Sequence, residues 1–407
     1  MQNVVRFASC CLLAAALAPS AGGQSSARLS PYLYVWGGTG TMTRDGIDMI
    51  AVIDADPASP HYGRVITALT VDSAGRMPHH SEFQLPSSGS VFVNDFGSDK
   101  SFLIDFTSPA HPRLHASMAA VPGAHKVHSF ARMPNGSVLA TIQFGDGTTT
   151  GNAGGLGLFD TNGTLIRFSS SADAAFPNAR IRTYALTTLP AIDRIVTTSS
   201  PMDEEPTADV VQLWRMSDLK LLKTLAVPQA PTDSAGRYPF EVRTLADGRT
   251  VMMNTYYCGF YTISGLESEP KVERVMAMQH PRDIGCSVPV IVGRYMVMPI
   301  AFGHRFATLD IADPSHPIEV HSLATDSTFY PHWIATDPVS DRVVVTDQGN
   351  GPPLLMVGRL DAVTGTLSWD EKFTDPGAGK PGVSFIKDVW PNGVRGMVMP
   401  HGALFVH

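Results

Sequence analysis

Charged residues are scarce in this chain of 407 residues, and so are helical patterns. Asp, Glu, Lys and Arg make up 16% of the residues, and the formal net charge is −7. No cluster of lysine and arginine stands out, so a nucleic-acid-binding groove is not expected. Long amphipathic helical patterns are rare, whereas glycine (36 residues) and proline (31 residues) are frequent. This composition predicts turn-rich β structure.

Several motifs that would define a catalytic site are also missing. Neither Gly-X-Ser-X-Gly nor Cys-X-X-Cys occurs in the sequence. Residues 37–41 read Gly-Gly-Thr-Gly-Thr but lack the Lys-Ser/Thr ending of a phosphate-binding loop, so we predict a turn there. The chemistry must therefore be sought in residues that are far apart in the chain.

Long apolar runs are missing except at the N-terminus. Arg6 precedes the apolar residues 7–17, and small residues follow at 20–23. This pattern predicts a signal peptide over residues 1–23, followed by one domain over residues 24–407. We therefore expect a periplasmic or secreted protein that does not insert into the membrane after the signal is removed.

Cysteine is rare as well. Of the four cysteines, Cys10 and Cys11 would leave with the signal peptide, and Cys258 and Cys286 would remain. In an exported protein these two could form a disulfide, or Cys286 could be a free thiol. The sequence leaves both alternatives open.

What the chain does contain is an internal repeat. Residues 51–60, 102–112 and 307–317 each read as an apolar strand that ends in Asp, followed by a turn bounded by proline and then by another short strand. Asp can bond the turn amides, and proline bends the chain. A second marker is a histidine ahead of a turn and an apolar strand, at His80, His128 and His332, and His401 begins a similar unit.

The spacing of these units predicts a propeller. Units begin near His80, His128, Tyr184, Glu241, residues 286–287, His332 and His401, and the first six are separated by 48, 56, 57, about 45 and about 46 residues. Repeats of about 40–50 residues are typical of propeller blades. The last unit is cut short, and we expect residues 32–36 and 49–53 to complete it. The prediction is an all-β, seven-bladed β-propeller closed by pairing of N- and C-terminal strands.

Residues at the start of each innermost strand would face the axis and could form a metal site. Imidazoles suit Cu, Fe, Zn or Ni. The predicted metal ligands are five histidines: His79, His80, His128, His332 and His401. Glu241 could be a ligand, a second-shell partner that orients a histidine, or a proton acceptor. His304 could reach the channel, whereas four other histidines are expected at the surface: His111, His115, His316 and His321.

Several segments resemble the selenium-binding proteins, a family that includes methanethiol oxidases. Residues 54–62 are similar to the family's Asp-Val-Asp-Pro-X-Ser-Pro-X-Tyr. Residues 78–81 resemble its His-His-Ser segment, and residues 125–129 resemble its His-Thr-Ser-His. Further counterparts cover most of the mature chain and lie at residues 154–160, 239–243 and 310–314.

The resemblance implies a seven-bladed propeller in which histidines hold copper. It also implies oxidation of methanethiol by O2 to formaldehyde, hydrogen sulfide and hydrogen peroxide. The implied ligands are His79, His80 and His128, with His125 beside them, and His401 matches a histidine near the family's C-terminus. His332 follows from the repeat alone.

The chain departs from the family in one segment, and two other functions remain open. Residues 84–88 replace the family's Cys-X-X-Cys, so selenium carriage is not expected. Our hypothesis is a copper-dependent oxidase with a small thiol and O2 as substrates. One alternative is a periplasmic metal-binding or scaffold propeller without activity. The other is a four-histidine iron dioxygenase, with iron in place of copper.

Overall fold

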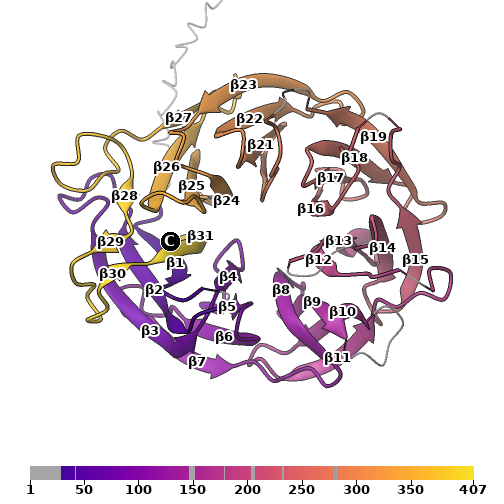
Figure 1. Ribbon diagram of the computed structural model, residues 1–407, viewed down its shortest axis with the longest axis horizontal. Helices are drawn as coiled ribbons and strands as arrows, with labels where there is room; N and C mark the ends of the chain where they lie inside the picture. The colour runs from indigo at the N-terminus through magenta and orange to yellow at the C-terminus, as the bar shows by residue number, and fades with distance from the viewer. Residues whose placement is uncertain are drawn as a thin grey trace, which may run out of the picture.

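The protein is a ring of seven β-sheets, shown by a computed structural model (Figure 1). It describes residues 29–41, 43–145, 152–177, 179–202, 207–231, 233–278, 280 and 282–407. The predicted signal peptide lies outside these residues. Six sheets have four strands and one has five, and all their strand pairs are antiparallel. The predicted seven-bladed β-propeller is therefore confirmed.

The blades are numbered here in chain order. Blade 1 contains β4 (Pro78–Ser81), β5 (Ser90–Asp95), β6 (Lys100–Asp105) and β7 (Arg113–Ser117). Blade 2 contains β8 (Ala124–Arg132), β9 (Val138–Gly145), β10 (Ala153–Phe159) and β11 (Leu165–Ser170). Blade 3 contains β12 (Thr183–Leu189), a 3₁₀ turn (Pro190–Ile192), β13 (Arg194–Ser199), β14 (Val210–Arg215) and β15 (Leu221–Ala226). Blade 4 contains β16 (Pro239–Thr244), β17 (Val251–Thr255), β18 (Gly259–Ser264) and β19 (Lys271–Ala277).

The remaining blades include both ends of the described chain. Blade 5 contains β20 (Val290–Val292), β21 (Tyr295–Ile300), β22 (Arg305–Asp310) and β23 (Ile318–Ala324). Blade 6 contains β24 (Pro331–Thr336), β25 (Arg342–Asp347), β26 (Leu354–Leu360), β27 (Leu367–Trp369) and β28 (Val383–Ser384). Blade 7 contains β31 (Met399–Val406), β1 (Tyr32–Gly38), β2 (Gly46–Asp54) and β3 (Val65–Gly75). A small hairpin, β29 (Ile386–Lys387) and β30 (Gly396–Met397), precedes β31.

Blade 7 closes the ring because it combines the two ends of the chain. β31 is its innermost strand and pairs with β1, with Val406 opposite Tyr32. Residues 32–36 and 49–53 lie in β1 and β2 as predicted. The outer strand β3 follows the turn of residues 54–60, where the repeat predicts another short strand. Closure leaves no free edge at the seam of the ring.

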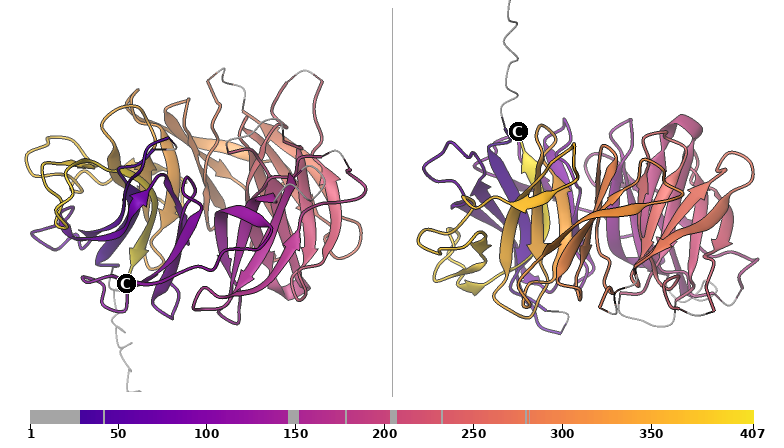
Figure 2. Two further views of the ribbon diagram at one scale, coloured as in Figure 1. Left: turned by 60° about the horizontal axis from the view of Figure 1, so that its bottom comes forward. Right: turned by 90° about the horizontal axis from the view of Figure 1, so that it is seen from above.

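Blades pack face to face, with strands running between the two faces of a short cylinder (Figure 2). The middle strands β9 and β25 are buried along their whole length, because neighbouring blades cover both of their faces. Outer strands such as β7 are mostly exposed. Tryptophans join adjacent blades: Trp36 Nε1 donates to Asn94 O at 2.8 Å, and Trp333 Nε1 donates to Ala403 O at 2.9 Å.

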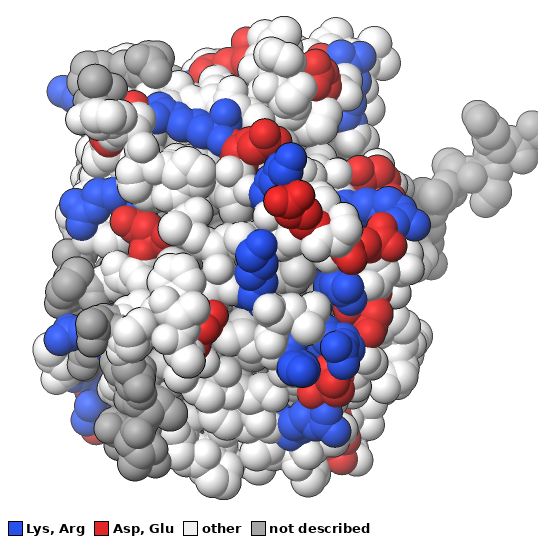
Figure 3. Space-filling model, turned by 90° about the vertical axis from the view of Figure 1, so that its right-hand side faces the viewer, with Lys and Arg blue, Asp and Glu red and all other residues white. Residues whose placement is uncertain are grey.

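The predicted Asp turns close the strand connections. Asp54, Asp105 and Asp310 each accept a hydrogen bond from the amide two residues later, at 2.8–3.0 Å. On the side of the ring formed by β15 and β19, acidic and basic side chains are interspersed among uncharged residues (Figure 3). Within the described part of that face, neither sign of charge forms a continuous patch. Among the described residues, no helix has the length and apolar character needed to cross a bilayer.

Each blade but the fifth has a β-bulge in its innermost strand, and this feature shapes the centre of the ring. The register shifts after Pro78, Val127, Thr183, Pro239, Pro331 and Pro400. A bulge places two residues of one strand opposite one of its partner and re-aims their side chains. The bulged pairs are residues 79–80, 128–129, 184–185, 240–241, 332–333 and 401–402.

Candidate metal centre

Five histidines from four blades meet on the axis of the ring. His79 and His80 come from β4, His128 from β8, His332 from β24 and His401 from β31. All five lie in bulged pairs. The bulge explains why both His79 and His80 contribute, although adjacent residues of a regular strand face opposite sides. Their rings stack with centroids 4.3 Å apart.

These imidazoles form two overlapping triads. In the first, His79, His80 and His128 each offer a nitrogen within 4.8 Å of the other two. In the second, His80, His332 and His401 do the same. His80 belongs to both triads. The Nε2 atoms of His79 and His128 are 3.0 Å apart, close to the separation of two nitrogens that each lie about 2.0–2.1 Å from one ion.

Three of the rings are held through their Nδ1 atoms. His128 Nδ1 lies 2.9 Å from the carbonyl oxygen of Tyr184. A carbonyl only accepts, so this Nδ1 carries the proton and Nε2 presents its lone pair. His80 Nδ1 lies 2.9 Å from Ser129 Oγ, and His332 Nδ1 lies 3.2 Å from Ser287 Oγ. Such partners fix the orientation of histidines that bind metals.

The free nitrogens of the cluster fit a metal ion. Buried atoms without a hydrogen-bond partner among the described residues are His79 Nδ1, His80 Nε2, His332 Nε2 and His401 Nδ1. Leaving a buried polar atom unsatisfied costs about 1–3 kcal/mol each. Several such atoms in one cluster indicate a ligand that binds nitrogen lone pairs. The histidine cluster could therefore hold a metal ion, with the donors that copper, zinc and iron accept.

Burial keeps these histidines neutral. Desolvation lowers the pKa of His128 to about 3 and that of His332 to about 4. The pKa values of His79, His80 and His401 also fall well below the usual range, first through burial and then through repulsion between the imidazoles. At neutral pH each ring keeps a lone pair that a metal can use.

Glu241 lies in the bulge of β16 but belongs to neither triad. Its Oε2 accepts a hydrogen bond from Arg243 Nη1 at 2.7 Å, and its Oε1 is buried without a partner among the described residues. Burial raises the pKa of Glu241, whereas Arg243 opposes that rise. Arg243 lies 4.7 Å from the centroid of Phe83, which packs against Trp333 beside His80.

Other predicted positions serve different roles. His125 is exposed and stacks on Phe144, with centroids 5.4 Å apart, so it lies outside the cluster. His304 lies 3.2 Å from Phe329 O and does not belong to either triad. His111, His115 and His316 are exposed as predicted. His321 lies in the outer strand β23 and is partly exposed, and its Nε2 lies 2.9 Å from Leu367 O.

The partners of the clustered histidines were not predicted. Ser287 lies at the start of a repeat unit and Ser129 directly follows His128, but a repeat position does not show which histidine a side chain bonds. Arg243, two residues after Glu241, was not predicted either. Cys286 is bonded to Cys258, which answers the question that the sequence left open. Cys286 therefore does not offer a thiol to the axis.

A cavity lies on the side of the cluster toward which the innermost strands run. Its volume is about 260 Å³, and its lining includes Phe83, Arg132, Thr187 and Arg243. These residues follow the bulged pairs by one to three positions. Phe83 stacks on Trp333 with centroids 4.4 Å apart, and Trp333 lies 5.0 Å from His80. The cavity is thus separated from the histidines by a thin layer of aromatic and cationic side chains.

The fold and the cluster define the protein as a seven-bladed propeller with a candidate metal centre on its axis. A hypothetical selenium-binding protein from Sulfolobus tokodaii has this fold, with a TM-score of 0.73 and 14% identity over 93% of this chain and 94% of that chain. A periplasmic gluconolactonase of Pseudomonas aeruginosa shares the fold as well, with a TM-score of 0.63 and 14% identity over 92% and 99% of the two chains.

A curated relative supports the family at the level of sequence. The chain is 25% identical over 228 residues to a methanethiol oxidase of a Hyphomicrobium species, which covers 50% of this chain and 49% of the relative. The match thus spans about half the length of that protein. No family model matches the chain. The resemblance to the selenium-binding and methanethiol oxidase family is confirmed.

Proposed function

We propose that this protein is an exported, copper-dependent oxidase of a small thiol such as methanethiol. The cluster of buried, neutral imidazoles with unpartnered nitrogens carries the proposal. Similarity to a methanethiol oxidase supports the choice of substrate, and the N-terminal sequence pattern supports export.

The reaction balances without a further reactant. One methanethiol, one O2 and one water give one formaldehyde, one hydrogen sulfide and one hydrogen peroxide. The carbon loses two electrons and O2 gains them. When bound, copper supplies the transfer of electrons from the thiol to O2.

Residues of the chain then have distinct tasks. The cavity beside Phe83 admits the thiol, and the stack of Phe83 on Trp333 keeps bulk water from the histidines. Glu241 Oε1 accepts the thiol proton, since it is a buried carboxylate oxygen without a partner among the described residues. The Arg243 guanidinium pairs with this carboxylate and opposes the rise in its pKa that burial causes.

The experiment compares metal content with turnover. Protein from copper-replete cells should contain copper, and methanethiol should then release hydrogen peroxide and formaldehyde. His128→Ala should lose both copper and turnover. His125→Ala is the matched control, because His125 lies three residues away on the same strand but outside the cluster.

Other outcomes would select the alternatives. Full copper occupancy with no peroxide from methanethiol would favour a metal carrier. Protein without any metal would favour a scaffold. Iron in place of copper, together with cleavage of an alkene, would favour the dioxygenase.

A further inference from the structure

Blade 5 presents its innermost strand differently from the other six blades. β20 has three residues, and no register shift interrupts its pairing with β21. The preceding residues 285–288 take the place of the bulge and are held by isolated bridges, Cys286 with Ile300 and Val288 with Trp333. Ser287 lies in this segment, and its Oγ is 3.2 Å from His332 Nδ1.

The hydrogen bonds of Ser287 determine which nitrogen of His332 is free. The single hydroxyl proton of Ser287 is donated to Gly285 O at 3.0 Å. Its oxygen must then accept from His332, so His332 Nδ1 carries the ring proton. The lone pair is left on Nε2, which is buried and has no partner among the described residues. Ser287 thus sets the tautomer that a metal ion requires.

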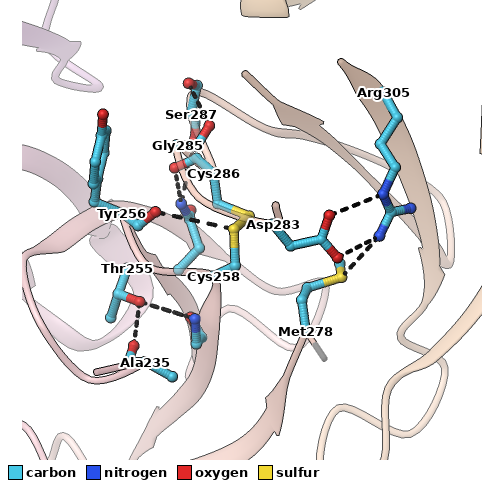
Figure 4. The surroundings of a disulfide bond; sticks show 12 residues. Ala235, Thr255, Tyr256, Cys258, Met278, Asp283, Gly285, Cys286, Ser287 and Arg305 are labelled. Carbon is cyan, nitrogen blue, oxygen red and sulfur yellow. Dashed lines mark hydrogen bonds and ion pairs between the residues drawn. A yellow bond between two sulfur atoms is a disulfide. The ribbon is translucent and has the colours of Figure 1, made fainter. Parts of the chain in front are cut away.

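A disulfide and a set of hydrogen bonds hold Ser287 in place (Figure 4). Cys286 is bonded to Cys258, which directly precedes β18 of blade 4. Asn254 Nδ2 donates to Cys286 O at 2.9 Å. Gly285 N donates to Tyr256 O at 2.8 Å, and Ser287 N donates to Pro299 O at 2.9 Å. The short strand β20 contributes little pairing of its own. The disulfide adds a covalent link between this segment and blade 4.

We propose that Ser287 is a positioning residue of the metal centre and that the Cys258–Cys286 disulfide keeps it in place. Metal affinity therefore depends on a bond whose sulfur atoms do not contact the metal ligands. The inference deepens the proposed function in one respect: it requires that His332 binds metal, but not that the substrate is a thiol.

The first test measures copper affinity by competition with a chelator. Ser287→Ala should weaken binding about 10–100-fold, the range typical of residues that orient a metal ligand. Ser137→Ala is the matched control: Ser137 is also buried, but its hydroxyl bonds Asn135 in a turn of blade 2. Equal affinity of Ser287→Ala and wild type would overturn the role of Ser287.

The second test needs no metal. Nitrogen NMR of the metal-free protein with labelled histidine reports the tautomer of each ring, and His332→Gln identifies the signal. Wild-type His332 should be protonated at Nδ1, and Ser287→Ala should give a mixture. If the tautomer and the copper affinity change as expected but copper-loaded wild type releases no hydrogen peroxide from methanethiol, the proposed function fails while the positioning role stands. An unchanged tautomer would sink the positioning role.

The third test removes the disulfide. A dithiol reduces the Cys258–Cys286 bond to two thiols with two electrons and two protons, and itself closes to a cyclic disulfide. Reduced protein and the Cys258→Ala/Cys286→Ala variant should both show a mixture of His332 tautomers. Both should also bind copper more weakly than wild type, as Ser287→Ala does. Circular dichroism checks that the blades remain folded, and the reduced protein supplies the comparison if the double variant does not fold. If reduced, folded protein keeps the copper affinity and the His332 tautomer of wild type, the disulfide does not hold Ser287 in place.

Discussion

At the scale of single residues, His80 has the central position because both triads include it. Its Nε2 has no partner among the described residues, while its Nδ1 lies against Ser129 Oγ. His79 and His401 each belong to one triad. Loss of His80 therefore breaks both groups, whereas loss of His79 or His401 leaves one triad intact.

His80→Ala should weaken copper binding more than either His79→Ala or His401→Ala. Because loss of a partner that only orients a ligand costs about 10–100-fold, we expect loss of this ligand to exceed about 100-fold. Chelator competition measures the difference, with His125→Ala as the control. Equal losses of copper affinity in all three variants would argue against membership of His80 in both triads.

The buried histidines should make the metal-free protein sensitive to acid. Their folded pKa values lie below 6.5, at about 3 for His128 and about 4 for His332. The unfolded state then binds more protons than the folded state, so stability falls as the pH drops from about 6.5 toward 3–4. Urea unfolding at a series of pH values measures this slope, and His128→Gln should reduce it. If His128→Gln leaves the slope unchanged, the lowered pKa of His128 does not cause the acid sensitivity.

Asp48 should give the stability of the protein the opposite dependence on pH. It is completely buried, and burial together with Asp95 raises its pKa to about 9. The groups that face it are Asp95, Asp72 and Lys100. Since the folded state keeps the proton while the unfolded carboxyl loses it near 3.8, stability falls as the pH rises from about 4 to 9.

Asp48→Asn should therefore raise the melting temperature at pH 8 and flatten the decline in stability above pH 4. An amide keeps the shape of the protonated carboxyl and can donate to Asp95. Thermal unfolding between pH 5 and 9 tests this, with Asp45→Asn, at an exposed ion pair, as the control. A lower melting temperature at pH 8 would contradict the raised pKa of Asp48.

At the scale of elements, the bulges decide what reaches the axis. Regular alternation would send His79 and His80 to opposite sides of β4, yet both rings stand in the cluster. A bulge in β16 likewise places the buried Glu241 side chain beside Arg243. The strand period predicts which strands are innermost. It does not predict a bulge, because a bulge depends on how each strand meets its neighbour.

At the scale of the whole molecule, the ring depends on contacts between the ends of the chain. Arg342 and Asp337 of blade 6 form an ion pair with neither side chain exposed. Arg342 Nη2 also donates to Ser30 O at 2.8 Å, and Ser30 Oγ donates to Asp337 Oδ1 at 2.7 Å. This network joins blade 6 to the segment that leads into β1.

Asp337→Ala should destabilise the protein by about 3–5 kcal/mol, because it leaves the Arg342 charge buried without its partner. Asp341→Ala is the control, since Asp341 pairs with Arg359 at the surface, where a pair contributes about 0–1 kcal/mol. Urea unfolding of both variants measures the difference. A similar loss of stability in both variants would show that the buried pair of Arg342 and Asp337 does not stabilise the contact between blade 6 and the segment before β1.

Much of the architecture was predictable because it is repeated. The Asp turns and the histidine-led units defined seven blades and the pairing of β31 with β1 and β2. The repeat also predicted a strand after the turn of residues 54–60, which is β3, although β3 has 11 residues and is longer than expected. The hairpin of β29 and β30 was missed, because its strands have only two residues each.

The repeat in the sequence predicted the ring and the five histidines near its axis, because each unit brings its equivalent residue to an equivalent point around one axis. The tertiary structure decides which nitrogens are free, through hydrogen bonds to Tyr184 O, Ser129 and Ser287 that the repeat does not predict. It also decided the pairing of Cys258 with Cys286. These contacts depend on how neighbouring blades meet, and no period within one strand records that.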